Sequence, residues 1–224
     1  MARTLNMVEW VRPTHQARSQ ETLERLLEAA EEVVAEKGFD NATVSEIVRR
    51  AKSSVGSMYA RFQDKDSLLV CLHERFCEQA LATSAAALDP VRWEGATIGE
   101  IFASAIPFVV HVYQLKRGLI RAFIVRGSTD HPFAERAARV SRDVSQQLVT
   151  LLETRRDEIR HPDPALAIDF GLRLMFDTLD SATLNADIQR TLFKHSPQQV
   201  AEELTRTFLS YLGVELMPTW ETPS

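Results

Sequence analysis

The sequence predicts an all-α protein, with a three-helix N-terminal part followed by a larger helical part. Apolar residues recur at i, i+3 and i+4 over long segments, which is the spacing of one face of an amphipathic helix. Capping signals stand before most of these segments, and no strand-like alternation competes with them. Only 8 glycines and 9 prolines among 224 residues argue against a turn-rich β protein.

The N-terminal part is predicted as helices over residues 19–37, 43–51 and 53–61, and a fourth helix over 65–87 leads into the larger part. The first helix carries an apolar stripe and ends before Gly38, a residue suited to the left-handed position after a helix. Thr43 and Glu46 form the pattern of a capping box at the start of the second helix. A serine at 53 or 54 can cap the third, very short helix, and Asp64 can cap the fourth.

Five more helices are predicted in the larger part. A second capping box, Thr97 with Glu100, opens the first of them. Asp163 and Ser196 are caps that stand directly before a proline, which is favoured at the first helical position. These helices are expected from residue 97, over 116–126, over 132–159, from residue 163 and over 196–213.

Composition excludes several classes of protein. The net charge of -5 gives no global attraction to nucleic acid or anionic membrane, so any nucleic-acid binding must come from a local patch. Cys71 and Cys77 fall on different faces of one predicted helix, which disfavours a disulfide and fits a reducing cytoplasm. The N-terminus lacks a signal-peptide core, and the longest apolar run, which carries Pro107, is far too short to span a bilayer. We therefore expect a cytoplasmic protein with no membrane partner.

The sequence offers little support for an enzyme. It contains no Gly-rich phosphate loop, no G-x-S-x-G and no C-x-x-C pattern. His73 and Cys77 have a spacing that can hold a metal, but two ligands are too few, and a packed cysteine beside a surface histidine is the ordinary explanation. Asp177 and Asp180 have no base near them and read as polar interface contacts. No catalytic residue, metal or cofactor is expected.

The predicted helices 43–51 and 53–61 have the length of a helix-turn-helix, a unit whose second helix enters the major groove of DNA. Local charge supports this interpretation. From Arg49 to Lys65, five basic residues stand against one acidic residue, a local charge of +4, whereas the first helix has a glutamate-rich polar face. The alternative for Arg49 and Arg50 is an ordinary solvated face.

Four residues explain the unusual composition of the segment 53–68. Gly56 permits close approach to a groove, and Ser57 offers a hydrogen bond to a base or a phosphate. Tyr59 can donate its hydroxyl to a phosphate, and Lys65 at a helix start forms an anion site. The alternative for Tyr59 is a packed aromatic ring; Met58 and Phe62 are expected in the core.

The stretch "TVSEIVRRAKSSVGSMYARFQDKDSLL" resembles the DNA-binding segment of the TetR-like transcriptional regulators, and the lead-in "ERLLEAAEEVVAEKGFDNATV" matches as well. The resemblance is specific from about Ser19 to Leu69. Beyond that it rests on the number and length of helices. The matching features are Thr43, Ile47, Ala51, the run 54–57, Tyr59, Phe62, Lys65 and Leu68, with Gly38 and Phe39 before them.

The resemblance implies an all-helical homodimer that binds operator DNA through this module and releases it when a small molecule enters the C-terminal domain. By position, Tyr59 and Lys65 would contact phosphates, and the groove-facing residues would be Ser54, Val55, Gly56, Ser57 and Arg61. Together with the cap Thr43 they form the expected DNA-binding set. The chain departs from the family at Val55, at Ala60 and at Arg61, so base preference does not carry over.

The helix from Asp163 is apolar on two sides, so it needs two partners. One side carries Leu166, Phe170 and Leu174, and the second helix of the pair, 196–213, adds further apolar residues. We expect a four-helix interface across a two-fold axis, which also suits two DNA half-sites. The alternative is that both helices close a monomeric core.

An effector cavity is expected around Pro107, where a kink is predicted within the helix that begins at residue 97. A mostly apolar lining with a few polar groups suits a lipophilic or aromatic effector. The alternative for each of these residues is ordinary core. The expected lining is Phe102, Ile106, His111, Tyr113, Phe123, Arg126, Phe170, Arg173 and Phe176.

The expected domains are an N-terminal extension over 1–18, a helix-turn-helix DNA-binding domain over 19–66 and a helical effector-binding and dimerisation domain over 67–224. The extension is expected to be flexible, or else an arm that uses Arg3, Arg12 and Arg18 to reach DNA. The expected function is repression with ligand-induced release from the operator. The competing function is a helical dimer that binds another protein, without sequence-specific DNA binding.

Overall fold

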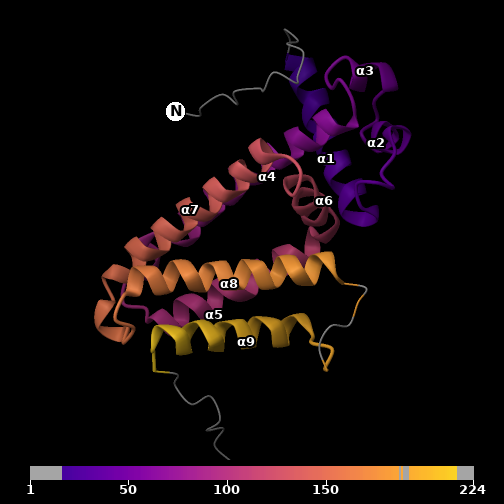
Figure 1. Ribbon diagram of the computed structural model, residues 1–224. Helices are drawn as coiled ribbons and strands as arrows, with labels where there is room; N and C mark the ends of the chain where they lie inside the picture. Colours follow the sequence, from indigo (N-terminus) through magenta and orange to yellow (C-terminus); the bar gives the residue numbers. More distant parts are fainter. Residues whose placement is uncertain (1–16, 187, 189–191, 216–224) are drawn as a thin grey trace, which may run out of the picture. The chain divides into compact units, whose positions relative to one another are not determined.

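The computed structural model describes residues 17–186, 188 and 192–215 (Figure 1). Nearly all of the extension expected at 1–18 therefore lies outside the described residues, including the side chains of Arg3, Arg12 and Arg18. Within the described part every regular element is helical, so the all-α prediction is confirmed.

The elements follow the predicted order closely. The third helix, expected over 53–61, is shorter by two residues at each end, and the seventh ends at Glu153 and is followed by a separate 3-10 turn. A second 3-10 turn, over Pro90–Trp93, was not predicted. The elements are α1 (Ala17–Lys37), α2 (Val44–Arg50), α3 (Val55–Tyr59), α4 (Lys65–Ala87), η1 (Pro90–Trp93), α5 (Ile98–Leu115), α6 (Arg117–Gly127), α7 (His131–Glu153), η2 (Arg156–Glu158), α8 (Pro164–Leu184) and α9 (Pro197–Leu212).

The predicted helix caps form. Thr43 and Ser54 accept hydrogen bonds from the backbone N–H groups of Glu46 and Ser57. Ser196 forms a complete capping box, and Gly213 ends α9 with a φ of 71°. The box at Thr43 is only half formed, because the Glu46 carboxylate binds Lys37 instead of the backbone. Local sequence signals therefore fix most of the helix starts.

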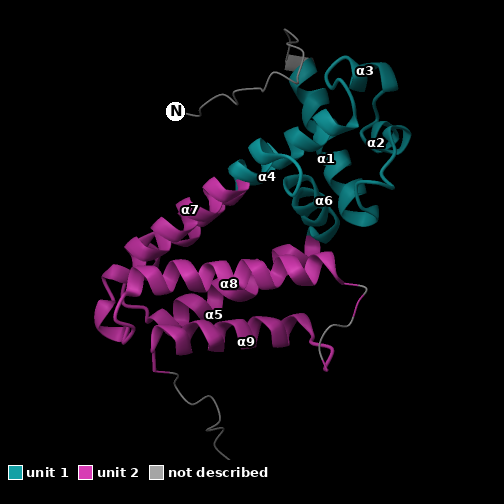
Figure 2. Ribbon diagram, viewed as in Figure 1, with its two compact units in different colours: residues 1–79, 116–136 teal, residues 80–115, 137–224 magenta. Residues whose placement is uncertain are grey.

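The chain divides into two compact units (Figure 2). Unit 1 runs to Gln79 and also includes Lys116–Arg136, so it contains α1–α3, the first part of α4 and α6. α6 belongs there because Leu119 and Phe123 are buried in the same apolar core as Leu26 and Met58. The boundary expected at residue 66 stays a prediction.

Unit 2 comprises Ala80–Leu115 and the chain from Ala137 onward. Within it α5 packs against α9 and α8. The rings of Phe102 and Phe208 lie 4.5 Å apart, and the Tyr113 hydroxyl donates to Asp180 Oδ1 at 2.7 Å. α5 continues through Pro107 as one helix, and the predicted kink stays a prediction.

α5 is also long and apolar enough to cross a membrane, by length and composition alone. Its 18 residues have a mean hydropathy of 1.4. The uninterrupted apolar run within α5 is too short to span a bilayer, whereas the whole helix reaches that length. Core helices also pass this test, and α5 buries Ile101, Phe102 and Ile106 in the core of unit 2.

Gly118 marks a close approach of α6 to α1. A Cβ atom there would lie 2.3 Å from the carbonyl oxygen of Val34, and backbone cannot move aside cheaply. We expect Gly118→Ala to lower the free energy of unfolding by about 1–3 kcal/mol, as overpacking does. Gly99→Ala is the matched control, because its Cβ would meet only Thr97 Oγ1 at 3.8 Å. Urea unfolding of both variants measures the difference, and equal stabilities would contradict this packing.

Asp64 caps α4, and its Oδ1 accepts hydrogen bonds from the Ser67 hydroxyl at 2.6 Å and the Ser67 N–H at 2.7 Å. These bonds hold the pKa of Asp64 below its ordinary value of 3.8. We expect Asp64→Ala to lower the free energy of unfolding by about 1 kcal/mol, the usual loss for a cap.

The neutral cap in Asp64→Asn separates charge from hydrogen bonding. Because the folded pKa is depressed, the ionised form stabilises the fold above pH 3.8, and this stabilisation is lost as pH falls through the folded pKa. The difference between wild type and Asp64→Asn is therefore expected to shrink on acidification. Chemical unfolding at several pH values tests this, and a gap that widens at low pH would refute it.

Candidate nucleic-acid interface

The turn between α2 and α3 is short and fully hydrogen-bonded. Ala51 N–H donates to the Ile47 carbonyl at 2.9 Å, and Ser53 N–H donates to the Val48 carbonyl at 2.8 Å. Lys52 takes a φ of 49°, a left-handed conformation uncommon for residues other than glycine. The chain therefore reverses in the few residues that a helix-turn-helix allows.

α3 buries one face and exposes the other. Met58 is fully buried, as is Phe62 just after the helix, and both were expected in the core. Val55 is 44% exposed and Tyr59 is 46% exposed, on a helix that the Ser54 cap begins. Tyr59 is thus not packed inside the fold, and its contact with DNA stays a prediction.

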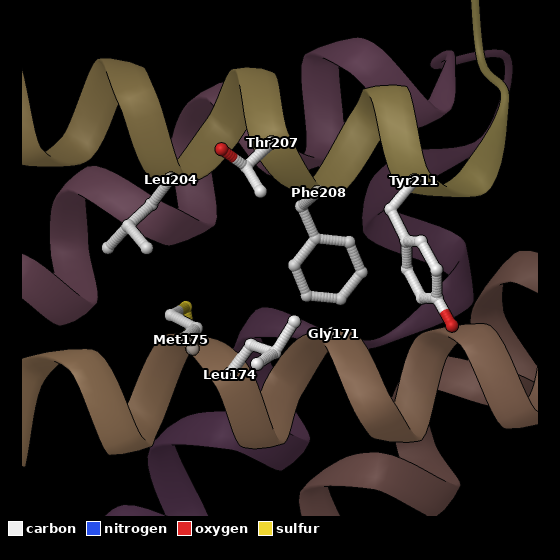
Figure 3. Close-up of a pocket in the computed structure, with 7 residues that line it drawn as sticks. All are labelled: Gly171, Leu174, Met175, Leu204, Thr207, Phe208 and Tyr211. Atoms are coloured by element: carbon white, nitrogen blue, oxygen red, sulfur yellow. The ribbon is translucent and has the colours of Figure 1, made fainter.

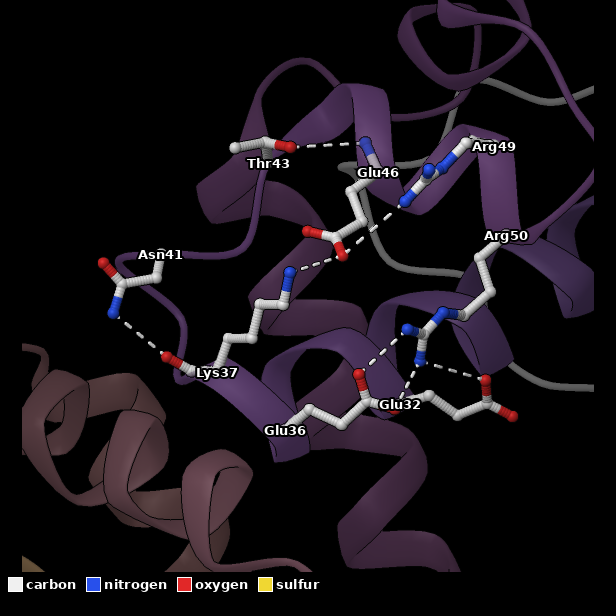
Figure 4. A network of polar contacts seen from close by, with 8 residues as sticks. All are labelled: Glu32, Glu36, Lys37, Asn41, Thr43, Glu46, Arg49 and Arg50. Atoms are coloured by element: carbon white, nitrogen blue, oxygen red, sulfur yellow. Dashed lines mark hydrogen bonds and ion pairs between the residues drawn. The ribbon is translucent and has the colours of Figure 1, made fainter.

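Much of the positive charge counted from the sequence makes ion pairs or hydrogen bonds within the protein (Figure 4). Arg50 donates to both carboxylate oxygens of Glu36, at 2.7 and 2.8 Å, and lies 3.5 Å from Glu32. Lys37 binds Glu46 at 2.6 Å. The hydrogen bond from Arg50 lowers the pKa of Glu36, and the hydrogen bond from Lys37 lowers the pKa of Glu46. These pairs join the end of α1 to α2.

Arg61 does not face the groove as expected. Its residue is only 8% exposed. One guanidinium nitrogen donates to the Ser57 carbonyl and hydroxyl, at 2.8 and 2.9 Å, and the other terminal nitrogen donates to the carbonyl and hydroxyl of Ser19, at 3.2 and 2.9 Å. The side chain turns inward because α3 ends at Tyr59, so Arg61 follows the turn toward α1.

Lys65 also makes contacts within the protein. Its ammonium group donates to the carbonyls of Phe39 and Asp40, the latter at 3.3 Å, and lies 4.3 Å from the Phe39 ring centre. A phosphate at Lys65 would have to share the ammonium group with these carbonyls. Arg49, whose side chain is 80% exposed, and the exposed Lys52 are left as the accessible cations between Arg49 and Lys65. The predicted charge of +4 therefore overstates what DNA would meet.

The expected effector residues are distributed over both units. Phe123 lies in the core of unit 1, and Arg126 of the same unit pairs with Asp66 and Asp130. In unit 2, Phe102 and Ile106 are buried, and Tyr113 is held by Asp180. Phe176 is half-buried. The remaining expected residues of unit 2 are exposed, namely His111, Phe170 and Arg173.

An apolar groove between α8 and α9 was not predicted (Figure 3). Phe208 points from α9 toward Gly171 of α8, and a Cβ at Gly171 would lie 2.7 Å from that ring. The spacing of Gly171 and Phe208 in separate helices gave no sign of this contact. The groove is lined by Gly171, Leu174, Met175, Leu204, Thr207, Phe208 and Tyr211.

His73 is a core residue, which corrects the expectation of a surface histidine. It is 2% exposed and stacks on Phe133 with ring centres 3.7 Å apart. Burial lowers the pKa of His73 to about 4, and burial raises the pKa of Cys77, 3.5 Å away, to about 11. Among the described residues no group of three potential metal ligands comes together.

Comparison with known proteins gives a family model and a relative whose sequences match part of this chain. The family model for bacterial regulatory proteins of the tetR family matches residues 26–71. The HTH-type transcriptional regulator YvdT of Bacillus subtilis is 38% identical over 58 residues. That match spans 26% of this chain and 30% of YvdT, so the chain aligns with less than a third of that relative.

Solved structures resemble most of the fold. A chain from Mesorhizobium loti assigned to the TetR family is 16% identical, with a TM-score of 0.69 over 88% of this chain and 98% of its own. The regulator FadR of Bacillus subtilis, solved with stearoyl-CoA, is 18% identical, with a TM-score of 0.58 over 85% and 97%. RolR, solved with resorcinol, is 25% identical, with a TM-score of 0.54 over 88% and 90%.

The matched family is described as bacterial regulatory proteins, and two of the similar structures named above are those of transcriptional regulators. The matched residues 26–71 cover most of α1, all of α2 and α3 and the first turns of α4, which are the elements that present Val55 and Tyr59. The comparisons therefore match the N-terminal helices to the tetR family of bacterial regulatory proteins, and they match the fold to that of TetR-family regulators.

Proposed function

We propose that this regulator is a homodimeric repressor that binds operator DNA through α2 and α3 and leaves it when a small lipophilic or aromatic molecule binds. The observation that carries the proposal is the exposed face of α3. Val55 and Tyr59 stay open to a partner on a helix whose other side is fully buried. Val55 and Tyr59 are four residues apart and therefore share one face of α3, and aromatic residues are enriched on surfaces that bind a partner.

In this proposal α3 lies in the major groove, as the second helix of a helix-turn-helix does. Gly56 and Ser57 permit close approach, and the Tyr59 hydroxyl donates to a phosphate. Arg49 and Lys52 supply the accessible positive charge beside α3. Thr43 and Ser54 act indirectly, because their side chains are already used as caps of α2 and α3.

The second subunit is proposed to cover α8 and α9. Leu166, Phe170 and Leu174 follow one another at four-residue spacing on α8, and all three are exposed. This row continues into the groove lined by Leu204 and Tyr211 of α9 (Figure 3). A patch of this kind suits a self-complementary interface between two copies of one chain.

The effector is proposed to bind in unit 2. Stearoyl-CoA and resorcinol in the structures of FadR and RolR support an apolar or aromatic ligand class for this fold. The candidate contacts that remain in unit 2 combine apolar side chains with the Tyr113 hydroxyl and the Asp180 carboxyl, which suits recognition by shape with a few polar contacts.

Binding to DNA is tested by shift assays on duplex from the region upstream of the protein's own coding sequence, with salt varied. We expect sequence-selective binding and a steep decrease of affinity with salt. Tyr59→Phe removes only the hydroxyl and should weaken binding about fivefold, as the loss of one hydrogen bond does. The loss should be equal for specific and random duplex, because a phosphate contact carries no sequence information.

Ser141→Ala is the control, since it removes a hydroxyl from an exposed position of α7 outside both proposed contact surfaces and should leave binding unchanged. Weak, sequence-blind binding by a wild-type protein that still dimerises would instead favour the protein-interaction function.

The dimer is tested by placing charge on the exposed row of α8. We expect Phe170→Glu and Leu174→Glu to convert dimer to monomer at micromolar concentration in sedimentation experiments, because burial of an unpaired carboxylate is costly. Val125→Glu, at an exposed position of α6, should leave the dimer intact. Circular dichroism checks that each variant remains folded, and a dimer that survives both α8 substitutions would refute the interface.

A further inference from the structure

Arg61 joins two segments that are far apart in the sequence. Its guanidinium group donates to both oxygen atoms of Ser57 in α3 and to both oxygen atoms of Ser19 in the first turn of α1. The four distances lie between 2.8 and 3.2 Å. One planar group with fixed donor directions therefore holds α3 against the start of α1.

The burial of the Arg61 cation lowers the stability of the fold. Among the described residues the contacts of Arg61 are with hydroxyl and carbonyl oxygens, and Nε is buried without a hydrogen-bond partner. Burying a cation without a carboxylate carries a large desolvation penalty, and an apolar side chain would avoid it. A costly buried contact at the edge of a predicted binding surface indicates a role beyond stability.

α3 also needs external support. Its five residues make few intrahelical hydrogen bonds, and a helix this short is not stable by itself. Met58 anchors its buried side by packing, which restricts its distance from the core. Packing of one apolar side chain does not fix rotation about the helix axis, whereas a guanidinium group that binds both Ser57 of α3 and Ser19 of α1 restricts it.

We propose that Arg61 is a positioning residue for DNA binding. It fixes the rotation of α3 relative to α1 and thereby orients Val55 and Tyr59 toward the DNA. The proposal rests on the DNA-binding function proposed above. In this role Arg61 contacts no phosphate or base. Replacing it therefore leaves the number of counterions released on DNA binding unchanged, and with it the dependence of affinity on salt. A direct phosphate contact and a positioning role therefore predict different salt dependences.

The first experiment uses the DNA-free protein. Hydrogen exchange is compared for wild type, Arg61→Gln and Arg61→Lys, with Arg25→Gln as the matched control at an exposed arginine of α1. We expect faster exchange confined to residues 55–62 in Arg61→Gln, partial recovery in Arg61→Lys and none of this in the control. Unchanged exchange in Arg61→Gln would overturn the proposal, as would uniform loss of protection throughout unit 1.

The second experiment measures affinity for the selected duplex and for random duplex over a range of salt. Arg61→Gln should lose at least about tenfold in affinity for the selected duplex, with less loss for random duplex and an unchanged salt slope. Arg49→Gln should instead lower the slope by about one unit, as the loss of one phosphate contact does. A lower slope in Arg61→Gln would overturn the proposal by showing direct contact.

Ser19→Ala provides an independent test, because Ser19 lies outside the expected DNA-binding set. It removes one acceptor of Arg61 without changing any charge and should reproduce part of the affinity loss. In the double variant with Arg61→Gln it should add nothing further, since both changes break one contact. Full additivity would overturn the proposal. If wild type binds no DNA while exchange changes as expected, the proposed function fails and the role of Arg61 in holding α3 stands.

Discussion

The structure of unit 1 depends on one constraint: α3 has only five residues and is not stable unless it packs against the rest of the unit. α1 provides the support, because its buried stripe of Leu26, Ala30 and Val33 belongs to the same core as Met58 and Phe62. α6 joins this core from a distant part of the sequence and approaches α1 so closely that only glycine fits at residue 118. The orientation of the exposed residues of α3 therefore depends on the packing of the whole unit.

Charge is used in two ways on this unit. Arg50 and Lys37 stabilise the junction of α1 and α2 through Glu36 and Glu46, and these pairs lie at the surface, where screening by solvent keeps each contribution small. Arg49 and Lys52 remain accessible. A formally acidic protein with a net charge of -5 can thus present a small cationic surface without a large basic patch.

The sequence predicted the helices well because their signals are local. Caps such as Ser54, Asp64 and Ser196 need only neighbours three residues away, and all three form. The position of Arg61 could not be predicted in this way, because its partner Ser19 is 42 residues distant. The same limit explains why the expected effector residues were divided between two units: helical spacing indicates which side of a helix is apolar but not which core receives it.

Burial of the two cysteines limits the chemistry of their side chains. Burial raises the pKa of Cys71 to about 12 and that of Cys77 to about 11, so both sulfur atoms stay protonated at neutral pH. Oxidants and electrophiles react with thiolates, and these side chains offer almost none. For the proposed function this favours an effector that binds reversibly by shape over one that reacts covalently with a cysteine.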